Sequence, residues 1–341
     1  MSDQTTDTAQ ESTKKDGLIA RFFKETELDT RLLGMIGALA LIWTGFHFYG
    51  AFFNGFGAFL TPRNLWNLSV QTASIGIMAT GMVLVIITRN IDLSVGSVLG
   101  FCAIVMGVVQ VYILPQYLGL GHPMIWVIAV LVGVACGAFI GAFHGFLIAY
   151  GNIPAFIVTL GGLLVWRGAA FLVARGETIS PVDPTFALMG GGPYGAIGST
   201  GSWIVGILGC AAVLGLIAMG RRNRRIFHIE QRPVWAETFL AVVGCGTVVG
   251  AVLLVNAYPW PRGIVKRYAE QEGITVPETG LFISHGFAIP VLILIAVAIY
   301  MTILMSRSRF GRYVYAIGGN PCLLYTSDAA DEGVEGGGAG G

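Results

Sequence analysis

The sequence predicts an all-α membrane protein, a polytopic bundle of transmembrane helices with about eight spans. Of its 341 residues, 55% are hydrophobic and only 11% are charged, whereas a soluble domain carries about 25% charged residues. The long apolar runs do not alternate with polar residues at every second position, which favours helices over the strands of a β-barrel. The 49 glycines fit such a bundle, because small residues let membrane helices approach closely.

Eight runs contain the roughly 20 mostly apolar residues that a spanning helix needs. They are residues 34–56, 67–88, 93–114, 124–150, 155–174, 202–220, 234–256 and 286–306. Residues 1–31 are polar and lack the apolar core of a signal peptide, so we expect a cytoplasmic tail there and a membrane domain over residues 32–321. The short turns at residues 89–92 and 151–154 are either loops or re-entrant breaks, and both possibilities remain open.

The lysines and arginines predict that the N-terminus is cytoplasmic. Basic residues gather in the tail, at residues 221–232 and at residues 307–312, and positive charge marks the cytoplasmic side of a membrane protein. The outer loop at residues 257–280 also carries cations, but three glutamates accompany them. The net charge of +1 gives no reason to expect nucleic acid as a partner.

Four glycines in the fourth span recur at every fourth position: Gly133, Gly137, Gly141 and Gly145. This spacing places them along one ridge, which is typical of a close contact with a neighbouring helix. His144 lies beside the ridge. It either has a structural hydrogen-bond partner or faces a polar pathway.

Residues 88–97, here called the polar seam, separate two apolar runs. Arg89 and Asp92 are the only charged residues between positions 64 and 174 apart from Arg167. The oxygens of Asp92 or Ser94 could cap the following helix, and a carboxylate suits its positive end. The alternative is that the seam lines a substrate path or contacts a partner subunit, because a charge beside hydrocarbon is costly and is a candidate for function.

Arg167 is the one charge deep in the fifth span. Such a charge usually faces the bundle interior or water and finds a partner there, although no acid can be assigned to it from the sequence. Thr159 precedes it by about two helical turns. We therefore expect both residues to lie on a substrate pathway together with Asp92 and Ser94.

Three blocks in order resemble the monosaccharide permeases of ATP-binding-cassette (ABC) transporters, the ribose, xylose and galactose branch. The first is IDLSVGS at residues 91–97, and the second is GFLIAY at residues 145–150 followed by IPAFIVTLGG at residues 153–162. The third is SRFGRYVYAIGGNP at residues 308–321. The basic segment and extra span at residues 221–258 are most similar to the D-xylose permeases, so the resemblance implies a permease subunit for a pentose in the bacterial inner membrane.

The resemblance also implies partners: a separate ABC ATPase subunit, an extracytoplasmic sugar-binding protein and a second copy of the permease. The third block would form the helix that couples to the ATPase, with contacts from Arg309, Gly311, Arg312, Tyr315, Gly318, Gly319 and Asn320. Gly318, Gly319 and Asn320 would permit a tight turn or a positive φ after that helix. No phosphate-binding Gly-x-x-x-x-Gly-Lys loop occurs, so we expect no enzyme activity, no cofactor and no catalytic or metal site in this chain.

The last 20 residues differ in character from the rest. Residues 322–332, CLLYTSDAADE, match a translated sequencing adapter, and the glycine-rich residues 333–341 lack apolar periodicity. We expect residues 322–341 to be adapter read-through. Members of the family continue past the third block through further spans, so the resemblance implies a truncated C-terminus and no transport by this chain as it stands.

Two other functions compete with a sugar permease. An ion-coupled secondary transporter of a small solute commonly buries acids at the middle of the membrane, and the middles of these apolar runs contain no Asp or Glu. A membrane enzyme would need clustered His, Asp or Glu residues, which are scattered here, and the five cysteines form no CxxC pair.

Overall fold

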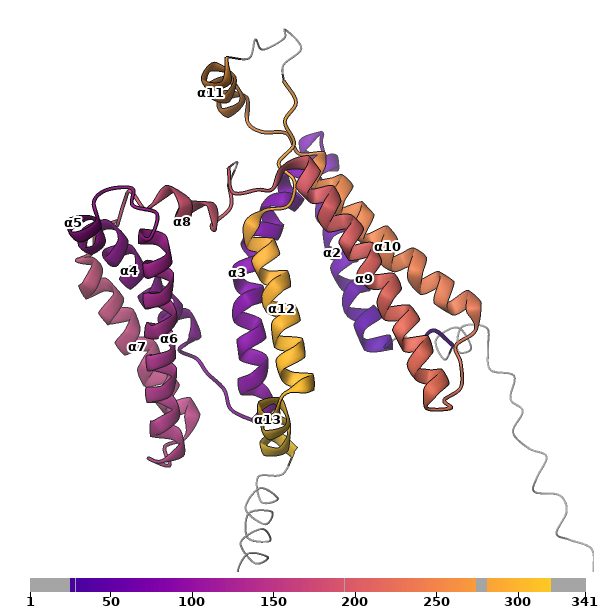
Figure 1. The fold of residues 1–341 in the computed structure, drawn as a ribbon, viewed down its shortest axis with the longest axis horizontal. Helices are drawn as coiled ribbons and strands as arrows, with labels where there is room; N and C mark the ends of the chain where they lie inside the picture. The colour runs from indigo at the N-terminus through magenta and orange to yellow at the C-terminus, as the bar shows by residue number, and fades with distance from the viewer. Residues whose placement is uncertain (1–24, 28, 193, 274–280, 320–341) are drawn as a thin grey trace, which may run out of the picture. The chain divides into compact units, whose positions relative to one another are not determined.

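The computed structural model describes residues 25–27, 29–192, 194–273 and 281–319. This part of the chain contains helices and loops with two isolated β-bridges and no strand (Figure 1). The predicted all-α class is therefore confirmed. Most of the predicted tail, Asn320 and the expected adapter read-through lie outside the described residues.

Eight helices in the described residues are long and apolar enough to cross a membrane, as predicted. They are α2 (Thr30–Asn54), α3 (Pro62–Ile87), α4 (Val95–Val108) with its continuation through η1 (Val109–Ile113) and α5 (Leu114–Leu118), α6 (Ile125–Ala149), α7 (Ala155–Ala174), α9 (Gly198–Ile226), α10 (Val234–Asn256) and α12 (Ile289–Arg307). Both short turns that the sequence left open join helices that are each long and apolar enough to cross a membrane, α3 to α4 and α6 to α7.

The largest difference from the predicted spans is at α9, which was expected to end at residue 220 and ends at Ile226. Arginines occupy most of this extra stretch. Arginine is a good helix former, so the helix continues after its sequence stops being apolar.

The helices divide into two compact units. Unit 1 contains residues 1–67 and 197–287, and unit 2 contains residues 68–196 and 288–341. The first residues of α3 belong to unit 1 and the rest of that helix belongs to unit 2.

The hairpin of α9 and α10 in unit 1 packs glycine against valine. A Cβ added at Gly206 would lie 2.6 Å from a methyl carbon of Val252, and one added at Gly244 would lie 2.8 Å from a methyl carbon of Val213. The two backbones are therefore as close as these side chains allow, the kind of contact that small residues provide between membrane helices.

Ion pairs at the connected end of this hairpin join α9 to α10 and join the hairpin to the segment before α2. Arg221 pairs with Glu237 at 2.6 Å, and Glu27 receives hydrogen bonds from Arg224 at 2.7 Å and from Arg232. The pKa of Glu27 is lowered, first by the hydrogen bond from Arg232 and then by that from Arg224. Three arginines of the basic segment thus have carboxylate partners.

At the other end of unit 1 an aromatic cluster surrounds the loop before α12. His285 is 1% exposed and stacks on Tyr258 with ring centroids 4.2 Å apart. The indole of Trp66 lies 4.8 Å from the His285 ring and donates to the Gly286 carbonyl at 2.9 Å. The short helix α11 (Arg262–Glu272) follows Tyr258 where only an outer loop was expected.

We predict that acid loosens this aromatic cluster. Burial lowers the pKa of His285, partly offset by its hydrogen bond to the Tyr258 carbonyl. Because the folded-state pKa lies below the unfolded value of about 6.5, the stability that the neutral ring provides is complete above about pH 6.5 and is lost as the pH falls through the folded-state pKa. The check is the thermal unfolding midpoint of the detergent-solubilised chain between about pH 7 and pH 5.

The matched control is His285→Phe, which keeps a ring against Tyr258 and Trp66 but cannot titrate. Its midpoint should depend less on pH than that of the unmodified chain. An equal pH dependence in both proteins would contradict the prediction.

In unit 2, α4 packs against both α6 and α7 (Figure 1). A Cβ added at Gly133 would overlap the Met106 sulfur, and one added at Gly137 would lie 3.7 Å from the Cys102 sulfur. Among the described atoms, none lies within 4 Å of a Cβ added at Gly141 or Gly145. The first half of the predicted ridge therefore faces α4, and packing of the second half stays a prediction.

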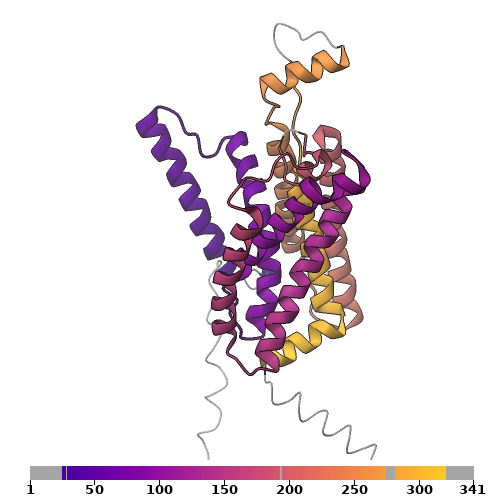
Figure 2. The ribbon, with the colours of Figure 1, turned by 90° about the vertical axis from the view of Figure 1, so that its left-hand side faces the viewer.

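The remaining long helices of unit 2 are α3 and α12, which lie side by side. A Cβ added at Gly76 would be 2.9 Å from a methyl carbon of Leu294. After α12 the chain turns at Ser308 into α13 (Arg309–Gly319), which runs across the end of α12 instead of continuing it (Figure 2).

Candidate functional site

The polar seam forms a tight turn between α3 and α4. One carboxylate oxygen of Asp92 accepts from the Ser94 amide at 2.7 Å and from the Ser94 hydroxyl at 2.6 Å. Ser94 is completely buried and is the residue before α4, but its side chain makes no capping bond to the helix. The expected side-chain cap from Ser94 to the helix is therefore absent. Instead, the Ser94 hydroxyl donates to the Asp92 carboxylate, and this bond fixes the orientation of the Ser94 side chain.

Thr159 lies beside this turn. It is 3% exposed, and its hydroxyl is 2.8 Å from the Ala155 carbonyl in its own helix and 3.3 Å from the Ile91 carbonyl in the seam. The first turn of α7 therefore contacts the turn that begins α4. Thr159 thus lies beside the turn that contains Asp92 and Ser94, and the role of these three residues in a substrate pathway stays a prediction.

Gly162 and His144 complete this contact one turn further along α7. A Cβ added at Gly162 would lie 2.6 Å from the His144 ring and 3.4 Å from the Ser94 Cβ. His144 is 8% exposed, and its Nε2 accepts from the Trp166 indole at 3.0 Å. Of the two possibilities for His144, the structure favours a structural histidine with a partner.

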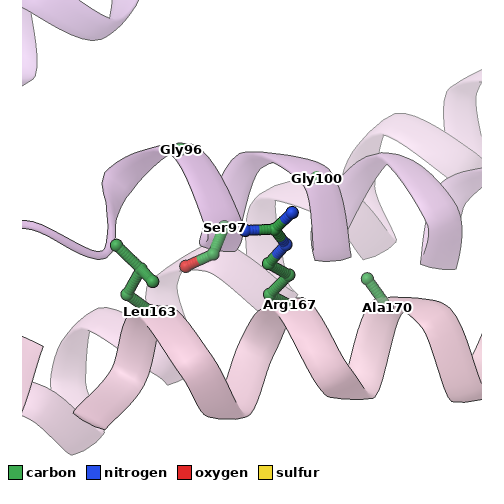
Figure 3. Close-up of a pocket in the computed structure, with 6 residues that line it drawn as sticks. All are labelled: Gly96, Ser97, Gly100, Leu163, Arg167 and Ala170. Atoms are coloured by element: carbon green, nitrogen blue, oxygen red, sulfur yellow. The ribbon is translucent and has the colours of Figure 1, made fainter. Parts of the chain in front are cut away.

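Arg167 lies in a different place, in an open cavity of about 340 Å³ between α4 and α7. The cavity is lined by Gly96, Ser97, Gly100, Leu163, Arg167 and Ala170. Figure 3 shows the guanidinium reaching from α7 toward α4 beside Ser97. Arg167 is exposed, and no hydrogen bond or ion pair to it occurs among the residues that the structure describes.

The four expected pathway residues therefore do not form one cluster. Thr159 and Arg167 are eight positions apart in one helix, which is about 12 Å along its axis. Asp92, Ser94 and Thr159 hold the start of α4 against α7, whereas Arg167 and Ser97 present hydrogen-bonding groups to the cavity.

The residues expected to couple to an ATPase lie on α13, whose two faces differ. Gly311 and Val314 are buried, and a Cβ at Gly311 would overlap the Met305 carbonyl. The opposite face exposes two arginines and three aromatic side chains, namely Arg309, Arg312, Phe310, Tyr313 and Tyr315. Cationic and aromatic side chains are enriched at protein interfaces, so this face has the composition of a docking surface.

A turn or a positive φ was expected at Gly318, Gly319 and Asn320. Asn320 lies outside the described residues, and for Gly318 and Gly319 the expectation is wrong. Both residues belong to α13 and neither has a positive φ. A Cβ at Gly318 would instead overlap the Ile87 carbonyl at the end of α3. Gly318 is needed for the close approach of two backbones.

Sequence reasoning missed Gln110, which lies in the π-helical turn η1 and is 4% exposed. Its side-chain oxygen accepts from the Asp183 amide at 3.2 Å, which ties the loop before α8 (Pro184–Leu188) to α4. Its side-chain nitrogen is buried without a partner among the described residues. The signal was available, because Gln110 is a lone amide in an apolar run and π turns often mark functional positions.

No group of three or more His, Cys, Asp and Glu residues in the described ranges could hold a metal ion. The arrangement offers hydrogen-bond donors and acceptors without a charged cluster.

Comparison with known proteins identifies the family. Residues 64–222 match the family described as the branched-chain amino acid transport system / permease component. The xylose transport system permease protein of Escherichia coli strain K12 is 34% identical over 264 residues, which cover 77% of this chain and 58% of that protein. The corresponding protein of Haemophilus influenzae is 33% identical over 77% of this chain and 60% of its own length.

The ribose import permease protein of E. coli K12 is 38% identical over 162 residues, which cover 45% of this chain and 46% of that protein. No solved structure matches the chain. The chain thus spans less than two thirds of the xylose permeases that it matches. These matches agree with the resemblance carried by the three sequence blocks, and the chain belongs to this family of transport-system permease components.

Proposed function

We propose that the protein is the membrane-spanning permease subunit of an ABC importer for a monosaccharide, with a pentose such as D-xylose as its substrate. The observation that carries the proposal is the 34% identity to a xylose permease along 77% of the chain. The lone cations and hydroxyls of the seam and cavity are compatible with a sugar, which needs hydrogen bonds more than charge. ATP hydrolysis is assigned to a separate subunit.

In this proposal the bacterial inner membrane contains the eight spans, and the N-terminus is cytoplasmic because the basic segments then face the cytoplasm. The arginine-rich end of α9 and helix α13 lie on that side, and α11 lies on the outside. The ATPase docks on the exposed face of α13, a sugar-binding protein delivers substrate from outside, and a second permease copy completes the passage.

The substrate pathway passes the cavity between α4 and α7. Arg167 presents donors to sugar hydroxyls, and the Ser97 oxygen, whose hydrogen is donated to the Ser94 carbonyl, presents an acceptor. Asp92, Ser94 and Thr159 set the position of α4 relative to α7. The second group is buried or half-buried, so its contribution is to geometry more than to direct contact.

The experiment that tests the function uses the permease reconstituted in liposomes with the proposed ABC ATPase and sugar-binding protein. Uptake of labelled D-xylose should require ATP on the ATPase side and binding protein on the other. Uptake that follows an ion gradient without ATP would overturn the proposal and favour a secondary transporter.

Variants at Asp92 separate its charge from its hydrogen bonds. Asp92→Asn keeps an oxygen that can accept from Ser94 and is expected to lower thermal stability only slightly, through loss of the charge at the positive end of α4. Asp92→Ala leaves the buried Ser94 hydroxyl unpaired and is expected to lower stability by about 1–3 kcal/mol. Thermal unfolding of the solubilised protein measures both, and equal midpoints would contradict the role assigned to the turn.

Normal uptake by Asp92→Asn would remove the Asp92 charge from the pathway, leaving only its hydrogen bonds.

A further inference from the structure

Arg89 forms a link between the polar seam and the end of α13. Its Nη2 donates a hydrogen bond of 3.0 Å to the carbonyl of Gly319, the last residue of that helix. The final carbonyls of a helix have no partner within the helix, and a cation at this end is favoured by the helix dipole. Arg89 therefore caps α13 from a position 230 residues earlier in the chain.

Arg89 has a left-handed backbone conformation at the end of α3. Its φ is +61°, and its amide and that of Asn90 bond back to the Ile86 and Val85 carbonyls at 2.9 and 3.1 Å. This left-handed residue ends α3, at a position where glycine is the usual choice because it has no Cβ. An arginine at this position carries a conformational cost that glycine would not.

A second contact, between the backbones of α13 and α3, lies beside the Arg89 hydrogen bond. Gly318 lies so close to the Ile87 carbonyl that a Cβ would overlap it, so the last turn of α13 touches the last turn of α3. Arg89, two residues after Ile87, donates its hydrogen bond to the same turn of α13. Displacing α13 must therefore move the end of α3, break the Arg89 bond, or both.

Only a few residues separate Arg89 from the part of α4 that lines the cavity between α4 and α7. Three residues further on, the Asp92 carboxylate holds Ser94, the residue before α4. Thr159 of α7 contacts the carbonyl of Ile91 in between. The first turns of α4 supply Gly96, Ser97 and Gly100 to the wall of the cavity that contains Arg167.

We propose that Arg89 is the positioning residue through which movement of α13 reaches the start of α4 and so changes the cavity between α4 and α7. This inference rests on the proposed function and adds to it a specific residue and route. Arg89 contacts neither the substrate nor the ATPase in this mechanism. When α13 moves, Arg89 moves the start of α4, which forms one wall of the cavity.

The test is Arg89→Gly in the complete transporter, with ATP hydrolysis and sugar uptake measured in the same liposomes. Glycine suits the left-handed backbone, so folding should be preserved while the guanidinium is lost. We expect normal assembly and continued ATP hydrolysis, with uptake per ATP reduced about tenfold, within the usual range of coupling energies. Arg89→Lys keeps a cation of different reach and should give an intermediate ratio.

The matched control is Arg222→Gln, which removes an exposed arginine from the basic segment of unit 1 and should leave the ratio unchanged. A second readout needs no transport: hydrogen exchange in α13 of the purified chain should be about fivefold faster in Arg89→Gly, because the end of the helix loses its cap.

The outcomes separate the inference from the function. If the unmodified transporter takes up sugar with ATP and Arg89→Gly has the same uptake per ATP, the inference is wrong and the function stands. If the unmodified transporter shows no ATP-dependent uptake, the proposed function fails and the inference with it. Unchanged exchange in α13 would show that the Arg89 bond does not hold the helix, and would also overturn the inference.

Discussion

Gly162→Ala is expected to destabilise unit 2 although alanine favours a helix more than glycine does. The added Cβ would lie 2.6 Å from one ring atom of His144 and 2.8 Å from another. The ring cannot swing away freely, because its Nε2 accepts the Trp166 indole hydrogen bond. On the other side the buried Ser94 limits movement of α4, with its Cβ 3.4 Å away.

The expected size follows from two opposing effects. Overpacking a well-packed contact costs about 1–3 kcal/mol, whereas replacing glycine by alanine inside a helix gains about 1 kcal/mol. Gly161→Ala has only the gain from replacing glycine by alanine in a helix, because no described atom lies within 4 Å of its added Cβ. The difference between these neighbouring variants therefore isolates the contact with His144.

The measurement is the thermal unfolding midpoint of each variant in detergent. Gly161→Ala should unfold at or above the temperature of the unmodified chain, and Gly162→Ala should unfold clearly below it. A midpoint for Gly162→Ala at or above that of Gly161→Ala would mean that α4, α6 and α7 do not meet as described. Combining Gly162→Ala with His144→Ala should cost less than the sum of the two changes, because they share one contact.

The spans were predictable because hydrocarbon imposes a simple rule of apolar length. The bounds of α7 and α10 agree with the prediction at both ends, since a proline stands before each helix and the apolar run ends where the helix ends. The helix α11 escaped notice because it is short, polar and lies outside any apolar run. Hydropathy carries no signal for such a helix.

The candidate site was predicted in part. Asp92 and Ser94 could be singled out because polar residues between apolar runs are rare, but the direction of their hydrogen bond depends on the geometry of the turn. That Arg167 lies in a separate cavity is set by the packing of α4 on α7. The contact of Gly318 with Ile87 joins residues 231 positions apart (318 minus 87), and no local pattern in one sequence reveals such a contact.

Gly318→Ala is expected to detach α13 from the end of α3. The neighbour in the way is the Ile87 carbonyl, which is backbone and cannot rotate aside as a side chain can. Because Gly318 lies in a helix without a positive φ, its own backbone tolerates alanine. Any loss therefore comes from the contact and not from the conformation of residue 318.

Undocking should be local, since α13 is the last described helix and can move without unfolding the long helices. Overpacking by about 1–3 kcal/mol would raise the population of the undocked state roughly tenfold or more. Trypsin reports this state directly, because Arg309 and Arg312 lie on α13 and a helix must open before a protease can cleave it. We expect cleavage at these two sites to be about tenfold faster in Gly318→Ala.

Gly319→Ala is the matched control. No described atom lies within 4 Å of its added Cβ, and its carbonyl remains available to Arg89. Cleavage of this variant should be no faster than that of the unmodified chain, because alanine favours the helix more than glycine does. Because the two glycines are adjacent and in the same helix, their difference depends only on which one faces Ile87. Equal cleavage of both variants would place α13 away from the end of α3, and the route from the docking helix to the seam would then lose its first step.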